Sequence, residues 1–102
     1  MKKTVCLLGM ALVLAGGNAL AVTEAMKKAG CMACHAQDKK LVGPSYNDVA
    51  AKYKGQDATA KVMDKVRNGG KGVFGPIPMP PNPVTKINDA DLKAAVESIL
   101  KG

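Results

Sequence analysis

The residues best suited to chemistry lie together in the stretch Gly30–His35, which reads GCMACH. Two residues separate Cys31 from Cys34, and His35, the only histidine of the sequence, follows directly. Two thiols and an imidazole in this order can form a redox-active dithiol, ligate zinc, or attach a haem. A disulfide between the two cysteines is the simplest alternative, but it leaves His35 without a role.

The rest of the sequence weakens two of these alternatives. A thioredoxin-like dithiol needs strands around it, but no stretch alternates apolar and polar residues for more than a few positions. A structural zinc site needs four ligands, and no second Cys-x-x-Cys or His-x-His completes one. Cys-x-x-Cys-His is the attachment signature of c-type haem. The motif therefore favours haem c bonded to Cys31 and Cys34, with His35 ligating the iron.

The first residues have the pattern of an export signal. Lys2 and Lys3 precede an apolar run from Val5 to Leu14, and Ala19-Leu20-Ala21 forms an A-x-A cleavage site. We expect residues 1–21 to be removed as a signal peptide. The apolar run falls short of the ~20 residues that span a bilayer, so we expect no membrane span.

The remaining residues, 22–102, are expected to form one domain with a thin core. The sequence has no Trp, one Phe and two Tyr. A domain of this size usually needs a disulfide, a metal or a large cofactor to complete its interior. A covalent haem would meet that need.

The apolar spacing predicts an all-α domain of about four short helices. Each expected helix has a recognisable start, and two have a recognisable end. The expected helices run from a Thr23 cap to about Ala29, from Pro44-Ser45 to Gly55, from an Asp57 cap to Asn68-Gly69-Gly70, and onward from an Asn88 cap with Asp91 in the first turn.

A long loop, Gly69 to Ile87, separates the last two expected helices and is rich in glycine and proline. Irregular loops longer than ~12–15 residues are uncommon in small domains unless they are functional or disordered. Because this loop also carries apolar side chains, we expect it to pack against something.

The same loop holds the candidate for the second axial ligand of a haem iron. The sequence has no second histidine, which leaves methionine sulfur as the expected ligand. Met26 and Met63 fall on inward helical faces, where core packing explains them, and Met32 lies inside the Cys-x-x-Cys. Met79 lies between two prolines that stiffen its backbone, so it is the expected ligand.

Five segments of the chain match the pattern of a known family. They are GCMACH at 30–35, VGPSY at 42–46, DVAAKY at 48–53, NGG at 68–70 and GVFGPIPMPPN at 72–82. Together they resemble the small class I monohaem cytochromes c of the bacterial cytochrome c-551 type. The resemblance implies a compact all-α fold with crossing terminal helices around one covalent haem c, and a one-electron carrier in the periplasm.

The resemblance also implies roles for residues around the iron ligands. Pro44 would accept a hydrogen bond from the His35 imidazole and so fix its ring. Asn82 would lie near the Met79 sulfur and tune the iron through a hydrogen bond, although a turn residue is a simpler explanation. Gly30 would permit the close approach of two helices.

Two positions depart from the family pattern. Phe74 stands where relatives commonly have a Trp whose indole N–H reaches a haem propionate, and Ala95 stands where they often have Trp. Lys65, Arg67 and backbone N–H groups are the remaining propionate candidates. Surface solvation explains the two cations equally well.

A methionine sulfur opposite the histidine closes the iron to small ligands and raises its reduction potential. After His35 is used as a ligand, no histidine remains as an acid or base. We therefore expect an electron carrier and not an enzyme. The alternative is a haem enzyme, or a haem protein that responds to gas or peroxide, in which Met79 is a labile ligand. A thiol oxidoreductase is a second rival.

The resemblance further implies the kinds of redox partner, and the charge suggests how they dock. The donor would be a quinol-oxidising complex or another dehydrogenase, the acceptor a nitrite reductase or a terminal oxidase, and the carrier a monomer. The formal net charge of +7 falls by two with the signal peptide and still favours an acidic partner. We expect no nucleic-acid partner, because an exported protein would be separated from the DNA of the cell. The docking candidates are Lys27, Lys28, Lys39, Lys40, Lys52, Lys54, Lys71 and Lys86.

Overall fold

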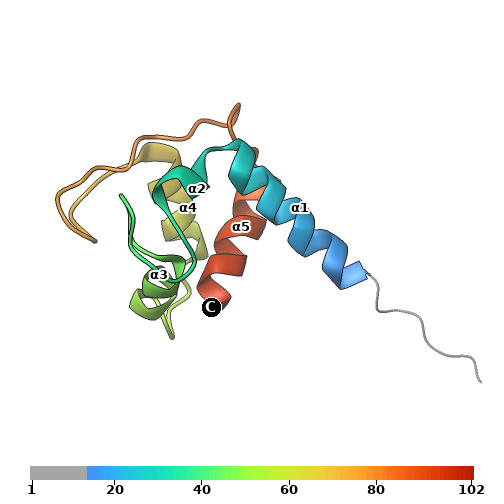
Figure 1. The fold of residues 1–102 in the computed structure, drawn as a ribbon, viewed down its shortest axis with the longest axis horizontal. Helices are drawn as coiled ribbons and strands as arrows, with labels where there is room; N and C mark the ends of the chain where they lie inside the picture. The colour runs from blue at the N-terminus through green and yellow to red at the C-terminus, as the bar shows by residue number, and fades with distance from the viewer. Residues whose placement is uncertain (1–13) are drawn as a thin grey trace, which may run out of the picture.

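The structure, a computed structural model, describes residues 14–102, in which helices are joined by irregular segments (Figure 1). The helices are α1 (Leu14–Lys28), α2 (Cys31–Cys34), α3 (Tyr46–Lys52), α4 (Thr59–Asn68) and α5 (Asp89–Lys101). Within the described residues there is no strand, only two isolated bridges, His35 with Lys40 and Gly70 with Met79. The expected all-α fold is confirmed. The helix beyond the expected four is the single turn α2, formed by the cysteine motif itself.

Helix α5 is the centre of the fold, because α1, α3 and α4 all pack against it. Figure 1 shows α1 crossing α5, as the resemblance implies. Most of the buried apolar side chains form two clusters, Ala29 with Ile87, Leu92 and Val96, and Met26 with Tyr46 and Ala95. Cys31 packs against both clusters, so the haem-attachment motif lies directly on the core.

Two of the four expected helix starts are confirmed by their caps. The Ser45 hydroxyl accepts a hydrogen bond from the Asp48 N–H at 3.0 Å, and the Asn88 side chain accepts one from the Asp91 N–H at 2.8 Å. Each side-chain oxygen thus satisfies one of the free N–H groups in the first turn of its helix.

The other two expected starts are wrong. Thr23 lies inside α1, because the helix continues upstream through Leu14. Helix α4 begins at Thr59 with Ala58 in the cap position and no side-chain cap bond, so Asp57 does not cap it. Ala58 is only 3% exposed. At the start of α4 there is thus a buried alanine and no side-chain oxygen to cap the helix.

The predicted cleavage site falls inside α1. Most of the predicted signal peptide, residues 1–13 with Lys2 and Lys3, lies outside the described residues. Helix α1 runs through the Ala21-Val22 junction. Signal-peptide cleavage stays a prediction. None of the helices in the described part of the chain is long and apolar enough to cross a membrane.

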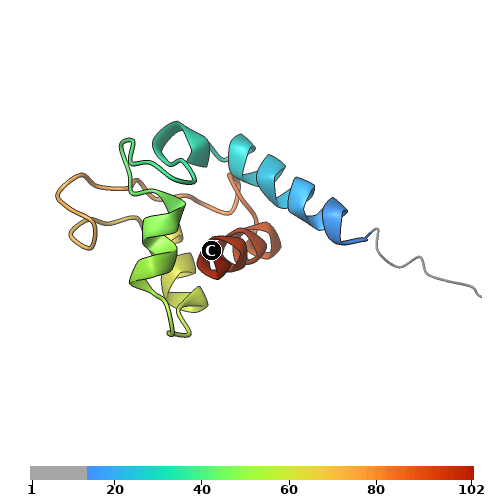
Figure 2. The same cartoon turned by 60° about the horizontal axis from the view of Figure 1, so that its bottom comes forward.

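The loop between α4 and α5 extends away from the helices and returns to them (Figure 2, orange). Four apolar side chains of this loop, Val73, Phe74, Ile77 and Val84, are exposed. Three of them, Val73, Phe74 and Ile77, line the wall of one cavity, described next. That arrangement explains how a loop of this composition holds apolar side chains outside the core.

Candidate haem site

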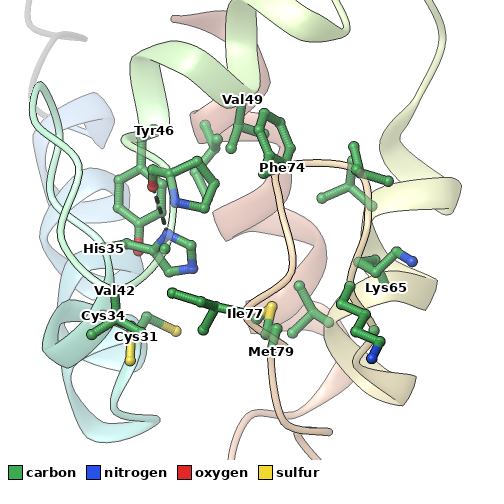
Figure 3. Close-up of a pocket in the computed structure, with 18 of the residues that line it drawn as sticks. Cys31, Cys34, His35, Val42, Tyr46, Val49, Lys65, Phe74, Ile77 and Met79 are labelled. Atoms are coloured by element: carbon green, nitrogen blue, oxygen red, sulfur yellow. Dashed lines mark hydrogen bonds between the residues drawn. The ribbon is translucent and has the colours of Figure 1, made fainter.

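One apolar cavity brings together the residues that the sequence selects for haem binding. Cys31, Cys34, His35 and Met79 all line it. In Figure 3 His35 lies on one side of the cavity, and Met79, carried by the loop, lies on another. Core side chains form part of the wall, among them Met26, Ile87, Leu92, Ala95 and Val96. A large apolar group in this cavity would therefore complete the thin core.

The single turn α2 presents both thiols to the cavity. The His35 N–H donates to the Cys31 carbonyl at 3.0 Å, which closes the turn and places the imidazole beside the thiols. Cys31 and Cys34 are not joined by a disulfide. Partial burial of Cys31 raises the pKa of its thiol.

The need for glycine at position 30 has a different cause from the one expected. A Cβ atom at Gly30 would meet no protein atom within 4 Å, so close helix approach does not require the glycine. Its φ of 85° is the reason, because this left-handed conformation is unfavourable for other residues. Gly30 thus turns the chain between α1 and the cysteine motif.

The imidazole of His35 is fixed from one side by the main chain. Its Nδ1 lies 2.7 Å from the Pro44 carbonyl oxygen, a bond dashed in Figure 3. Because a carbonyl only accepts, Nδ1 carries the proton, and Nε2 is left with its lone pair free for a metal. The contact with Pro44 is the one that the resemblance implies, and it fixes the orientation of the ring.

Gly43 packs against the face of the same imidazole. A Cβ atom there would lie 2.6 Å from His35 Cε1 and 2.9 Å from Nδ1. The Gly43 N–H also donates to the Cys34 carbonyl at 2.8 Å, so the segment before Pro44 is held against the motif. Only glycine allows this approach without displacing the ring.

Tyr46 supports the imidazole from a further direction. Its ring stacks on that of His35, with centroids 5.2 Å apart and planes inclined by 22°. Its hydroxyl donates to the Met32 sulfur at 3.8 Å. Burial, with a smaller contribution from Cys31, raises the pKa of the Tyr46 phenol. The phenol is therefore a neutral packing group and not an acid or base at neutral pH.

Met79 is held by paired main-chain hydrogen bonds with the end of α4. Its N–H donates to the Gly70 carbonyl at 2.9 Å, and its carbonyl accepts from the Gly70 N–H at 3.1 Å. A Cβ atom on Gly69 would collide with the Met79 carbonyl and lie 3.0 Å from both Pro80 C and Pro81 N. The Asn68-Gly69-Gly70 stretch, expected only to end a helix, thus also carries the loop that presents Met79.

Asn82 is buried at 7% exposure just beyond Met79. Its side-chain amide donates to the Val66 carbonyl at 3.2 Å and to the Pro80 carbonyl at 3.0 Å. Both amide hydrogens are therefore used on main-chain oxygens here. Tuning of the iron through the Met79 sulfur stays a prediction, and the visible function of Asn82 is to hold the loop.

The two propionate candidates differ in position. Lys65 lines the cavity, whereas Arg67 is absent from the lining. The Arg67 guanidinium instead bonds to Asn82, Ile87 and Asp89. The position of Arg67 therefore does not fit the expected role of bonding a haem propionate, and Lys65 is the better candidate. Phe74 lines the cavity and supplies no donor, as expected.

Sequence reasoning missed three residues of this site. The sequence pattern placed Gly43 only within the family segment VGPSY, Tyr46 within that segment and on an expected helix, and Gly69 only at a helix end and within the segment NGG. The available signal was their position, since Gly43 and Tyr46 flank the Pro44 that contacts His35. Gly69 begins the loop that carries Met79. What each of them touches depends on contacts between distant segments.

Comparison with known proteins identifies the family. The cytochrome c family model matches residues 19–101. Cytochrome c2 of Rubrivivax gelatinosus is 49% identical over 79 residues, covering 76% of this chain and 93% of that protein. Cytochrome c-551 of Pseudomonas aeruginosa is 58% identical over 60 residues, which are 58% of each protein.

A solved structure has the same fold. The crystal structure of cytochrome c552 from Nitrosomonas europaea superimposes with a TM-score of 0.70 at 44% identity, covering 78% of this chain and 96% of that one. The resemblance to c-551 type proteins is thereby confirmed. The chain belongs to the cytochrome c family, whose membership implies one covalent haem c with its iron, and it is an electron carrier and not an enzyme.

Proposed function

We propose that this cytochrome is a periplasmic one-electron carrier whose haem iron is ligated by His35 and Met79. The observation that carries the proposal is the anchoring of Met79 on the cavity wall by its paired hydrogen bonds with Gly70. A methionine held in this way supplies a sulfur without needing the loop to rearrange. When bound, the haem supplies reversible one-electron redox chemistry at its iron.

The residues of the chain then divide the remaining tasks. Cys31 and Cys34 would hold the haem through thioether bonds, and His35 would ligate the iron through Nε2 because its Nδ1 is bonded to Pro44. Met79 would supply the second ligand and so exclude water and small ligands from the iron. The same two ligands in both oxidation states would keep the reorganisation on electron transfer small.

The lining of the cavity disfavours the alternative of a haem enzyme. No carboxylate lines it among the described residues, and the one histidine of the sequence is bonded to Pro44. An enzyme that cleaves peroxide needs a group placed to move a proton. The cavity offers Lys40, Lys65 and Lys71 but no such acid and base pair.

The partners we propose are a quinol-oxidising complex or another dehydrogenase as donor, and a nitrite reductase or terminal oxidase as acceptor. Positive side chains and exposed apolar side chains meet at the cavity mouth, including Lys40, Lys71, Val42 and Ile77. Such a surface suits a small transient interface with an acidic partner. We propose that the carrier is a monomer.

Exported protein tests the proposal by three assays on the same sample. A pyridine haemochrome spectrum should report one covalent haem per chain and no free Cys31 or Cys34 thiol. The ferric protein should exchange electrons rapidly with a candidate acceptor in stopped flow and bind cyanide slowly. Free thiols would support the dithiol rival, and fast cyanide binding with peroxide turnover would support the haem enzyme.

A further inference from the structure

Arg67, in the last turn of α4, connects three segments through one guanidinium. Nη1 donates to the Asn82 carbonyl at 3.1 Å and to the Ile87 carbonyl at 2.7 Å, while Nη2 bonds Asp89 Oδ1 at 2.6 Å. Asn82 and Ile87 lie near the end of the loop that carries Met79, and Asp89 begins α5. The guanidinium thus joins α4, the returning loop and α5.

The main chain of the same turn holds the same point of the loop. The Asn82 N–H donates to the Val66 carbonyl at 3.0 Å and to the Arg67 carbonyl at 3.2 Å. The last carbonyls of a helix lack partners within it, so Asn82 satisfies the end of α4. Arg67 therefore contacts Asn82 twice, accepting with its carbonyl and donating with its guanidinium.

The position of Asn82 is transmitted to Met79 through a stiff connection. Only Pro80 and Pro81 separate them, and the φ angle of proline is fixed by its ring. On its other side, Met79 is paired with Gly70. A shift of Asn82 must therefore move the Met79 main chain or break its pairing with Gly70.

We propose that Arg67 is a positioning residue for Met79, holding the returning loop so that the sulfur stays on the iron. The inference rests on the proposed ligation of the iron by Met79. Arg67 does not line the cavity, and it acts through Asn82 and the two prolines. These bonds occupy the guanidinium, which explains why Arg67 does not face the cavity as the propionate role expected from sequence would require.

The two carbonyl bonds, and not the ion pair, carry this task. Arg67 is 19% exposed, whereas Asp89 is 80% exposed, and ion pairs to such exposed carboxylates contribute little. The bonds to Asn82 and Ile87 are partly buried and charge-assisted, which makes them stronger than neutral hydrogen bonds. The planar fork of arginine reaches both carbonyls and Asp89 at once, which a single ammonium group cannot do.

The test measures how readily Met79 leaves the ferric iron of the haem-loaded protein. Cyanide binding to Met-ligated ferric iron requires the sulfur to leave, so its rate reports loop opening. We expect R67Q to bind cyanide about tenfold faster than the wild type, the size of one lost charge-assisted bond. R67K should fall between the two, and D89N should change the rate less than about threefold.

Two further variants separate positioning from general stability. Gly55→Ala places a side chain at a φ of 80° away from the haem site, so it should lower stability while leaving cyanide binding unchanged. Met79→Ala should bind cyanide fastest and defines the open limit. Amide hydrogen exchange at Asn82 should accelerate in R67Q and R67K but not in Gly55→Ala.

The inference is overturned if R67Q and R67K lose stability yet bind cyanide at the wild-type rate, or if D89N alone reproduces the R67Q effect. A different result would show that the proposed function itself has failed. Wild-type protein that binds cyanide as fast as Met79→Ala would show that Met79 is not a ligand, and both would fail for that reason. Where R67Q does not fold, R67K and the exchange at Asn82 give the decision.

Discussion

The main chains of Gly70 and Met79 pair through two hydrogen bonds, of 3.1 Å from the Gly70 N–H and 2.9 Å from the Met79 N–H. This pairing joins the end of α4 to the middle of the long loop, so the main chain of Met79 is held by a helix end.

Replacement of Gly69 by alanine should loosen Met79. The new methyl group would collide with the Met79 carbonyl, and the φ of 74° at position 69 is itself unfavourable for alanine. We therefore expect a loss of about 2 kcal/mol or more in the free energy of unfolding. The sulfur-to-iron charge-transfer band of the ferric protein should weaken at the same time.

Gly55→Ala is the matched control for Gly69→Ala. Gly55 has a φ of 80°, and its Cβ would meet no protein atom within 4 Å, so only backbone strain of about 1 kcal/mol is expected. Urea unfolding and the ferric spectrum measure both variants. Equal charge-transfer bands in the two would contradict the contact between Gly69 and Met79.

Replacement of Gly43 by alanine should displace the imidazole of His35. A Cβ atom lying 2.6 Å from His35 Cε1 forces the ring or the loop to move, at a cost of about 1–3 kcal/mol. We expect lower stability and a shifted reduction potential, measured by urea unfolding and by voltammetry.

Pro44→Ala serves as the control on this side of the site, because it keeps the main-chain carbonyl that accepts from His35 Nδ1. The potential should therefore change less in Pro44→Ala than in Gly43→Ala. A larger shift in Pro44→Ala would mean that the proline ring, and not the carbonyl, fixes the imidazole.

Tyr46 should make the protein less stable at high pH. Burial raises the pKa of its phenol in the folded state, whereas the unfolded phenol ionises near pH 10. Above about pH 10 the unfolded state therefore loses a proton that the folded state keeps, and the free energy of unfolding falls as pH rises.

The Tyr46→Phe variant removes this ionisation while keeping a ring that can stack on His35. Its free energy of unfolding should fall less steeply above about pH 10 than that of the wild type. Urea unfolding across this range measures both slopes. Parallel slopes would contradict a protonated, buried phenol in the folded protein.

Lysines at the cavity mouth should control docking with an acidic redox partner. Lys40 and Lys71 line the cavity and are exposed, whereas Lys93 on α5 does not line it. K40Q and K71Q should each lower the association rate at low salt and reduce its dependence on ionic strength. K93Q should leave both unchanged, and an equal effect from K93Q would mean that only net charge matters.

The sequence was sufficient to select four residues that the structure brings to one cavity. Cys31, Cys34 and His35 form a motif, and the proline frame of Met79 distinguishes it from methionines on helical faces. Ligation of the iron by Met79 stays a prediction. The cap at Asn88 was also predictable, because the cap bond forms within one turn of the chain. Such features depend on local sequence, which is why pattern reasoning reached them.

The contacts that hold these residues could not be predicted in the same way. Arg67 binds main-chain carbonyls of Asn82 and Ile87, and every residue carries a carbonyl, so no residue type signals the acceptor. Gly43 and Gly69 are required by the approach of segments that are distant in sequence. These features follow from how the segments come together in the fold.

The central claim is that Met79 ligates the iron opposite His35. The most direct measurement is the sulfur-to-iron charge-transfer band of the ferric protein, compared between the wild type and Met79→Ala. We predict that the wild type shows the band and that Met79→Ala lacks it and binds cyanide and carbon monoxide rapidly. A wild-type spectrum without the band, or a band that persists in Met79→Ala, would contradict the account.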